Sequence, residues 1–350
     1  MLRSAARALC APATVGLLLL APPSDLSAAA APPAPRRPRY VTSPIACEDG
    51  TTVIPWASPS REDTLARLRS ESFDVLVVGG GAVGAGVAWE AATRGLRVAL
   101  VERGDFGGGT SSRSTKLIHG GLRYLEAAVL RADRGALALV TQALEERAHV
   151  LRAAPFMARP LPIIVPVYDW PSAPWVWAGA KVYDLLSGLG AGAGAVPRSY
   201  WMDRDSALYA FPMLAREAAG GGGGSLKGGV VYFDGQMNDS RLNLLVALTA
   251  AQAGAAAANY VSCSALRHGP DGRAEGAVLR DEATGAEFAI RARAVVNAAG
   301  PGADTLRALD NAQAEKLITG SAGVHIVLPG HFSPDRMGLI VPKVRGRGLR

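Results

Sequence analysis

The chain has 350 residues, 49% of them hydrophobic and 19% charged, which is enough to bury a core and fill about two domains and excludes a disordered chain. Its formal net charge of +7 lies at the ends, because residues 1–40 carry +4 and residues 336–350 carry +5, which leaves −2 over 41–335. A nearly neutral body argues against a protein that binds nucleic-acid phosphates, so no nucleic-acid partner is expected.

Residues 1–40 are predicted to be a targeting segment. Arginine and serine occur in MLRSAARALCAPATVGLLLLAPP, and no acidic residue precedes Asp25. This composition is typical of a mitochondrial transit peptide. The apolar run Val15–Ala21 keeps a secretory signal as the alternative, and this run is too short, with prolines on both sides, for a membrane span.

The three cysteines, Cys10, Cys47 and Cys263, lack metal-ligand spacing and cannot form a disulfide framework. They favour a reducing compartment, and no metal site is expected. Residues 22–60 are rich in proline, alanine and serine, and a linker is expected over 41–70.

A strand, a turn, a helix and a second strand are predicted next, at Val75–Val78, Gly79–Gly84, Ala85–Arg94 and Leu96–Val101. The turn reads Gly-x-Gly-x-x-Gly, and Glu102 ends the second strand, a pattern typical of a dinucleotide-binding unit. The glycines allow a tight turn, approach of a pyrophosphate and close packing, while the helix start offers N–H groups to the phosphates. Glu102 is expected to accept hydrogen bonds from ribose hydroxyls.

The polar segment Thr110–Leu125, TSSRSTKLIHGGLRYL, has little apolar periodicity and leads into a helix predicted over Tyr124–Arg152. A nicotinamide-binding domain would continue with alternating helices and strands instead. A late strand, Ala294–Gly300 (AVVNAAG), is predicted to return to the glycine turn, where small residues let the backbone pass close to a cofactor. Such a late strand is typical of a flavin domain.

Several segments between Phe73 and Gly338 carry a resemblance, among them FDVLVVGGGAVGAG, LRVALVERGDF, GTSSRSTKLIHGGLRYL, VVYFDGQMNDSRLNLL, VVNAAGPGADTLR and SAGVHIVLPG. In this order they resemble the FAD-dependent glycerol-3-phosphate dehydrogenases, most closely the mitochondrial type. The block TSSRSTKLIHGG is far more specific than the glycine pattern.

The resemblance implies an α/β plus α+β fold: a Rossmann-like FAD-binding domain built from separated segments, and a substrate domain around an antiparallel sheet. It divides the chain into a transit peptide (1–40), a linker (41–70), two FAD-binding parts (71–155 and 230–312), a substrate-domain insertion (156–229) and incomplete substrate-domain strands (313–350).

The implied activity is oxidation of sn-glycerol 3-phosphate to dihydroxyacetone phosphate by hydride transfer to FAD, with electrons passed to ubiquinone. The implied location is the inner mitochondrial membrane, on whose surface the enzyme would be monotopic, and a homodimer is an allowed state.

The resemblance also assigns residues. FAD would be held by Gly79, Gly81, Gly84, Glu102, Thr110, Ser111, Ser112, Lys116, Leu117, His119, Gly120, Gly121 and Gly300. Substrate would be bound by Arg123, Tyr124 and His325, with Arg123 and His325 catalytic and His325 the candidate general base. The alternatives are a surface arginine at Arg123 and a core histidine on an apolar strand at His325. Met237 lies where a histidine is expected and is interpreted as a packing variation.

Aromatic residues gather in Tyr168–Leu186, where Trp170, Trp175, Trp177 and Tyr183 occur with Lys181. A membrane interface and an ordinary domain core both explain them. The glycine runs Gly190–Gly194 and Gly220–Gly224 are expected to be loops. The family continues beyond residue 350, so a related oxidase that uses oxygen and an inactive truncated product remain alternative readings of the function.

Overall fold

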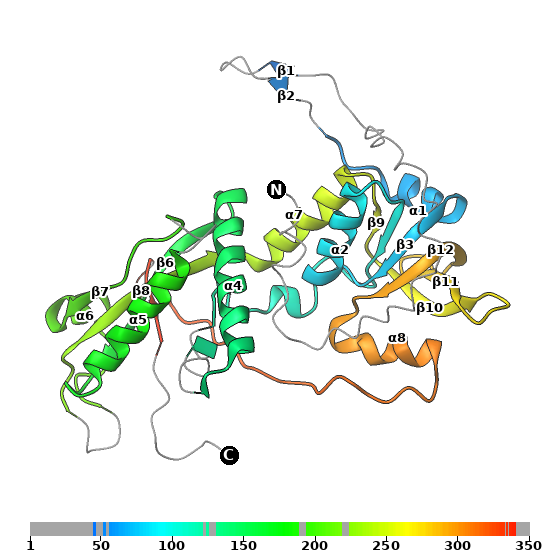
Figure 1. The fold of residues 1–350 in the computed structure, drawn as a ribbon. Helices are drawn as coiled ribbons and strands as arrows, with labels where there is room; N and C mark the ends of the chain where they lie inside the picture. Colours follow the sequence, from blue (N-terminus) through cyan, green and yellow to red (C-terminus); the bar gives the residue numbers. More distant parts are fainter. Residues whose placement is uncertain are drawn as a thin grey trace. The chain divides into compact units, whose positions relative to one another are not determined.

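The computed structural model describes Ile45–Ala46, Thr52–Val53 and residues 56–121, 124–125, 131–188, 194–218, 224–332, 334 and 336–340. The chain forms two compact units (Figure 1). The first contains the chain up to Ser114 together with Asp239–Ala322, and the second contains Thr115–Asn238 together with the chain from Gly323 onwards. The predicted transit peptide, Arg123 and most of the two glycine runs lie outside the described residues.

The first unit is built on a six-stranded sheet in the order β10-β11-β12-β3-β4-β9. The strands are β3 (Ser72–Val78), β4 (Val98–Val101), β9 (Ala256–Ala258), β10 (Val261–His268), β11 (Ala274–Asp281) and β12 (Glu287–Asn297). From β12 to β9 the pairs are parallel, and β10, β11 and β12 are antiparallel. β3 and β4 are almost continuous apolar runs, as expected of parallel strands that are buried on both faces.

Helices cover both faces of this sheet. They are α1 (Arg61–Ser70), α2 (Ala82–Thr93), α7 (Asp239–Gln252) and α8 (Ala303–Asp310). Leu76 of β3 packs in one core with side chains of α1 and α8, and Val77 packs in the other core with those of α2 and α7. The strand–turn–helix–strand prediction is confirmed to within a few residues at each boundary.

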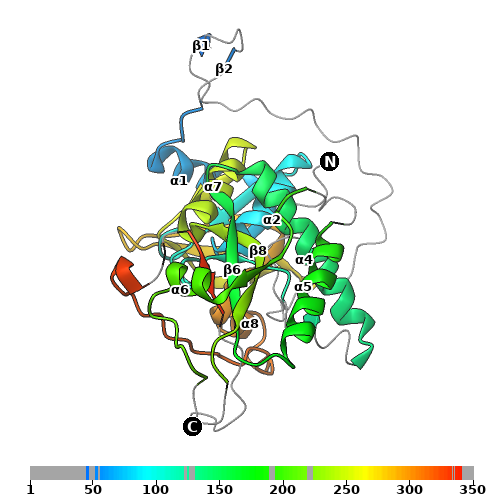
Figure 2. The same cartoon turned by 90° about the vertical axis from the view of Figure 1, so that its left-hand side faces the viewer.

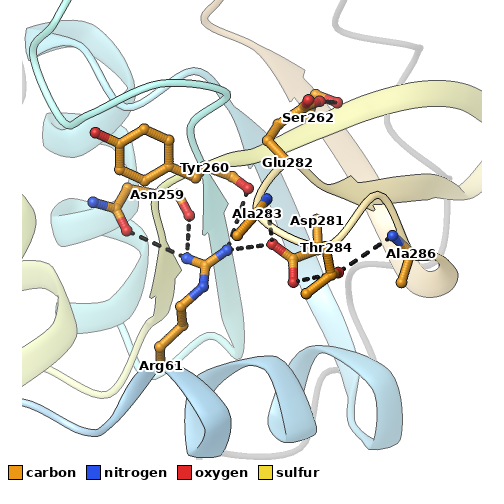
Figure 3. Close-up of polar contacts among 9 residues, drawn as sticks. All are labelled: Arg61, Asn259, Tyr260, Ser262, Asp281, Glu282, Ala283, Thr284 and Ala286. Atoms are coloured by element: carbon orange, nitrogen blue, oxygen red, sulfur yellow. Dashed lines mark hydrogen bonds and ion pairs between the residues drawn. The ribbon is translucent and has the colours of Figure 1, made fainter.

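The helix α1 lies within 41–70, where a linker was expected, so that expectation was wrong for its second half. Ser60 caps the helix by accepting a hydrogen bond from the Asp63 N–H at 3.1 Å, and Leu65 and Leu68 are buried in the core. At its start the Arg61 guanidinium donates to the Asn259 carbonyl at 2.6 Å and to Asp281 Oδ1 at 2.5 Å (Figure 3). These contacts make α1 part of the first unit.

The second unit is built on a sheet in the order β13-β6-β8-β5, with β7 also paired to β8. The strands are β5 (Leu117–Ile118), β6 (Ala158–Val167), β7 (Tyr200–Asp203), β8 (Gly228–Met237) and β13 (Gly338–Leu339). All pairs are antiparallel except β13 with β6, so the expected antiparallel sheet is confirmed with one parallel edge. Figure 2 shows α4 (Arg134–Ala153) and α5 (Ala173–Ser187) on one side of β6 and β8, with α6 (Arg204–Ala210) on the other.

Three boundaries differ from expectation. The helix predicted over Tyr124–Arg152 is interrupted: Tyr124, Leu125 and Arg131 are helical, the chain leaves the helix at Ala132, and α4 starts at Arg134, where Asp133 caps it by accepting a hydrogen bond from the Ala136 N–H at 3.0 Å. The chain enters the second unit at Thr115 and leaves it after Asn238, so α4 and β8 lie there rather than in the nucleotide-binding part. Between 313 and 332 the described chain contains no strand, and the expected substrate-domain strands are limited to β13.

Candidate nucleotide and substrate site

The glycine turn between β3 and α2 is shaped by the chain around it. Gly79 has a φ of 110°, and a Cβ there would lie 2.3 Å from the carbonyl oxygen of Ala298. A Cβ at Gly84 would lie 1.7 Å from the Gly79 carbonyl oxygen. The strand predicted to return to the turn is therefore confirmed: β12 runs parallel to β3, and its continuation at Ala298 lies against Gly79.

The middle glycine differs from its neighbours. A Cβ at Gly81 would come within 4 Å of the Ser111 side chain alone, with Oγ at 3.0 Å. Apart from this one hydroxyl, the described chain leaves the space above Gly81 open. This is where a dinucleotide-binding turn admits a pyrophosphate.

Ser111 lies at the start of α2. It belongs to the 3-10 helix η3 (Thr110–Ser112), and its Oγ accepts a hydrogen bond from the Ala82 N–H at 2.9 Å. The first N–H groups of a helix carry partial positive charge and have no partner within the helix. The structure thus brings one predicted cofactor residue, Ser111, to an anion-binding position. Thr110 is exposed, and the Ser112 hydroxyl donates to the Gly109 carbonyl at 3.1 Å.

Glu102 holds the turn from the end of β4. Its Oε2 accepts a hydrogen bond from the Gly80 N–H at 2.7 Å, and its Oε1 accepts one from the Gly104 N–H at 2.9 Å. A carboxylate offers about four acceptor sites, so two such bonds leave capacity for ribose hydroxyls. Glu102 is half-buried at the edge where a dinucleotide would bind.

Asn243 of α7 is a candidate site residue that was not predicted from the sequence. It is buried; its Nδ2 donates to the Gly80 carbonyl at 2.9 Å, and the Gly107 N–H donates to the same oxygen at 3.0 Å. Its Oδ1 is also buried and has no hydrogen-bond partner among the described residues. Because such an acceptor costs about 1–3 kcal/mol, a donor on a ligand would satisfy it. An asparagine within the apolar run LNLLVAL was the available sequence signal.

Two observations therefore fit FAD to this turn: the space above Gly81 and the buried acceptor of Asn243.

A further contact attaches the polar segment Thr110–Leu125 to α7. The N–H and hydroxyl of Ser114 both donate to Asp239 Oδ2, at 3.0 and 2.7 Å, and Asp239 is the first residue of α7.

The rest of the polar segment belongs to the second unit. Leu117 pairs with Gln236 and Ile118 with Gly235, which makes this part an edge strand beside β8. The Lys116 carbonyl accepts a hydrogen bond from the Met237 N–H at 3.0 Å, so Met237 serves the sheet through its backbone.

Beyond that strand the chain makes a tight turn. Lys116 and His119 are exposed, whereas Gly120 and Gly121 are buried, and Gly121 has a φ of 75° that favours glycine. The ring of Tyr124 lies against Gly121, where a Cβ would come within 2.7 Å of its Cδ2. Tyr124 nevertheless keeps 44% of its surface exposed.

The structure does not place all predicted residues in a site. His325 lies in an irregular segment, and its neighbours Val324 and Val327 are 88% and 95% exposed. The expectation that His325 lies on an apolar strand was wrong for the described chain, because no strand pairs with this segment. Gly300, with a φ of 56°, begins the 3-10 helix η5 (Gly300–Gly302) after the late strand, with no atom within 4 Å of where a Cβ would be.

A buried polar cluster behind Gly120 was also missed. Its members are Arg147 of α4, Tyr183 and Ser187 of α5, and Asp234 of β8, and each is almost fully buried. Burial raises the pKa of Asp234, and the Arg147 guanidinium and the Tyr183 hydroxyl act against that rise. Burial also raises the pKa of Tyr183 well above its ordinary value, so this hydroxyl stays protonated as a donor.

The aromatic segment Tyr168–Leu186 divides into two groups. Tyr183 is buried in the core, which confirms the core alternative for that residue. Trp170 and Trp175 are 61% and 59% exposed, and Lys181 Nζ lies 4.2 Å from the ring centre of Trp177. Within the described residues, the helices are all too short or too polar to cross a membrane.

In the described part of the chain, no three His, Cys, Asp or Glu side chains gather as metal ligands. Cys263 is half-buried on β10, and burial raises the pKa of its thiol to about 11. This thiol is therefore protonated at neutral pH.

The parallel sheet, the glycine turn and the late strand beside it define a dinucleotide-binding protein, and the second, antiparallel sheet is the arrangement expected of a flavin-dependent oxidoreductase. A family profile described as "FAD dependent oxidoreductase" matches residues 74–349, and the chain belongs to this family.

Curated relatives are similar over most of the chain. The mitochondrial glycerol-3-phosphate dehydrogenase of Macaca fascicularis is 49% identical over 290 residues, which cover 81% of this chain and 38% of the relative. Glycerol-3-phosphate dehydrogenase SDP6, mitochondrial, of Arabidopsis thaliana is 48% identical over 298 residues, covering 85% of this chain and 46% of the relative. The chain thus spans less than half the length of these relatives.

A solved structure is also similar. The glycerol-3-phosphate dehydrogenase of Bacillus halodurans, complexed with FAD, superposes with a TM-score of 0.52 at 30% identity, covering 72% of this chain and 39% of that chain.

Proposed function

We propose that this chain oxidises sn-glycerol 3-phosphate to dihydroxyacetone phosphate with FAD as the hydride acceptor. One observation carries the proposal: relatives named glycerol-3-phosphate dehydrogenase are 48–49% identical over more than four-fifths of the chain. The geometry supports the cofactor part, because the space above Gly81 and the acceptor of Asn243 suit a bound dinucleotide.

Residues of the first unit would hold the nucleotide half of FAD. The turn Gly79–Gly84 and Ser111 would receive the pyrophosphate at the start of α2, where N–H groups and a hydroxyl offer hydrogen bonds. Glu102 would accept hydrogen bonds from the ribose, and Gly300 would allow close approach after the late strand. When bound, FAD supplies the isoalloxazine ring that accepts the hydride.

Residues of the second unit would serve the ring and the substrate. Lys116 and His119 carry exposed cationic or polar side chains, which would stabilise negative charge on the reduced ring. The substrate phosphate requires a cation, a role proposed for Arg123, with Tyr124 beside it. Loss of the hydride leaves a hydroxyl proton to be removed, and His325 is the proposed base.

The proposed location is the inner mitochondrial membrane, where ubiquinone would take the electrons. The names of the relatives support a mitochondrial protein. The exposed Trp170 and Trp175 with Lys181 support a monotopic membrane contact, since indole rings and lysine favour the lipid–water interface. A homodimer is a further part of the proposal.

Flotation of the protein with liposomes tests the membrane contact. The fraction of protein that floats should fall when Trp170 and Trp175 are both changed to serine, and an unchanged fraction would count against this patch.

The visible spectrum of the purified full chain tests the function. We expect flavin absorbance that glycerol 3-phosphate bleaches, with dihydroxyacetone phosphate formed in equal amount. Arg123→Ala and His325→Ala should each lower the bleaching rate at least about 100-fold, the size typical of a lost acid–base group. A chain that holds no flavin would refute the proposal, and rapid re-oxidation by oxygen without quinone would indicate an oxidase instead.

A further inference from the structure

The turn His119–Gly120–Gly121 is attached to a buried chain of hydrogen bonds. The Gly120 N–H donates to the hydroxyl oxygen of Tyr183 at 2.8 Å, and the Tyr183 hydroxyl donates to Asp234 Oδ1 at 2.7 Å. Only 1% of Tyr183 and 2% of Asp234 are exposed. The phenol therefore has a single arrangement that satisfies both partners, as acceptor from the turn and donor to the carboxylate.

Arg147 fixes the far end of this chain. Its Nη1 donates to Asp234 Oδ1 at 2.6 Å and to the Phe233 carbonyl at 2.9 Å, and its Nη2 donates to the Ser187 hydroxyl. No part of the Arg147 side chain is exposed. The contacts connect α4, α5 and β8, so three elements together orient one tyrosine hydroxyl.

A buried ion pair contributes little net stability to a protein core. Desolvation of both charges offsets most of their attraction, and apolar side chains of similar volume often stabilise a protein more. Compared with apolar side chains, buried charged groups have one remaining advantage. Their hydrogen bonds are directional and hold neighbouring groups in a fixed geometry. In this cluster the group at the end of the chain is the backbone of Gly120.

Steric contacts act on the same turn. A Cβ at Gly120 would lie 2.6 Å from Leu144 Cδ2 and 3.0 Å from the Tyr183 hydroxyl oxygen. Gly120 is buried, whereas His119 beside it is exposed. The turn is thus fixed from its buried side at Gly120, next to the exposed His119.

We propose that Tyr183, Asp234 and Arg147 are positioning residues that hold this turn ready for the flavin. The inference rests on the proposed function, which assigns His119, Gly120 and Gly121 to the flavin ring. The cluster does not touch the cofactor in this account. It acts through the Gly120 N–H, and it sets the backbone conformation before FAD binds.

The variant Tyr183→Phe tests this, because it removes one hydroxyl and keeps the ring. Tyr232→Phe is the matched control. Tyr232 is buried, its ring meets that of Tyr183 edge-on at 5.7 Å, and the described residues offer its hydroxyl no hydrogen bond. Both variants lose one oxygen from the same core, and Tyr183→Phe alone deprives Gly120 of its acceptor.

Hydrogen exchange of the flavin-free chain is the first measurement. We expect amide exchange in a peptide covering 119–121 to rise about tenfold in Tyr183→Phe and to stay unchanged in Tyr232→Phe. The FAD dissociation constant should rise about tenfold in Tyr183→Phe alone, with an altered fine structure of the bound flavin spectrum. Asp234→Asn, which weakens the acceptor of the Tyr183 hydroxyl, should loosen the same peptide and serves if Tyr183→Phe does not fold.

Equal exchange at 119–121 in the two tyrosine variants would overturn the proposal, as would a rise spread evenly over the whole chain. A wild-type chain that binds no FAD would refute the proposed function and leave the exchange comparison valid. The two failures are thereby distinguishable.

Discussion

At the scale of single residues, the three glycines of the nucleotide turn serve different purposes. Gly79 and Gly84 are required by the chain, because a Cβ at either would collide with a carbonyl oxygen. A Cβ at Gly81 would meet only the Ser111 hydroxyl, at 3.0 Å, so this glycine mainly leaves room for a bound group. Two of the three glycines in this motif are therefore needed for folding, and the third is needed for binding.

The first prediction concerns Gly84 and a glycine two residues further along α2. Gly84→Ala places a methyl group 1.7 Å from the Gly79 carbonyl oxygen, so we expect a loss of about 3 kcal/mol in unfolding free energy and of FAD binding. At Gly86 a Cβ would have no neighbour within 4 Å, and Gly86→Ala should raise stability by up to about 1 kcal/mol. Urea unfolding and flavin titration measure both. Equal effects of the two changes would contradict this reading of the turn.

Some residues of the site could be predicted from the sequence, and others could not. The spacing Gly-x-Gly-x-x-Gly after a strand identified the turn, since few other arrangements need that pattern. Arg147 could not be assigned to a core from sequence, because an arginine is ordinarily exposed and only the surrounding elements bury it. His325 was misplaced onto a strand because its apolar neighbours fit one, and a strand forms only where a partner strand is available.

At the scale of elements, α1 shows how a short helix becomes part of a domain. Its two buried leucines supply little apolar area, and the Arg61–Asp281 pair attaches its first turn to the sheet (Figure 3). Burial alone would raise the pKa of Asp281, but hydrogen bonds from Arg61, Thr284 and the Ala283 N–H lower it below its ordinary value. The prediction of a linker here was wrong. Ser60 and Asp63 form a helix cap, but the proline-rich composition around them indicated a linker.

The second prediction follows from that pKa. A lowered carboxyl pKa adds stability that is fully present above the unfolded value of about 4 and is lost as the pH falls through the folded value. Asp281→Asn should therefore cost about 2 kcal/mol at pH 7, and its difference in stability from the wild type should be smaller at pH 3, below the unfolded value. Urea unfolding at both pH values measures it.

Asp271→Asn is the matched control for this change. Asp271 is 58% exposed and pairs only with the exposed Arg273, so its replacement should alter stability by less than about 0.5 kcal/mol at either pH. If Asp281→Asn behaved like Asp271→Asn, the ion pair would not be what attaches α1.

At the scale of the whole molecule, each unit has its own sheet and its own cores. All four clusters of buried apolar side chains in the described chain lie within one unit or the other. The chain leaves the first unit after Ser114 and re-enters it at Asp239, and these two residues are hydrogen-bonded. The sequence predicted two domains and separated segments, but the polar composition of 110–125 hid the point of crossing.

The third prediction is that the first unit folds alone. A chain of residues 56–322 in which a short glycine linker replaces 115–238 keeps all six strands of the sheet and the four helices that cover it. We expect cooperative urea unfolding by circular dichroism, as for other single domains. A gradual, non-cooperative transition would show that the unit needs the inserted segment. The control is the same linker-joined chain without β12, which should fail to fold.

The pairing of Ser72 with Arg291 has a consequence for biosynthesis. Two strands at the centre of the first sheet are more than two hundred residues apart in sequence, so their contact has a high loop-closure cost and forms late. While the ribosome is still making the intervening segment, both edges of the β3–β4 pair are unpaired, because β12 and β9 follow later, and the apolar faces are uncovered, a state prone to aggregation. The nucleotide turn acquires its contact with Ala298 only once β12 has been synthesised, so a complete cofactor site forms late in folding.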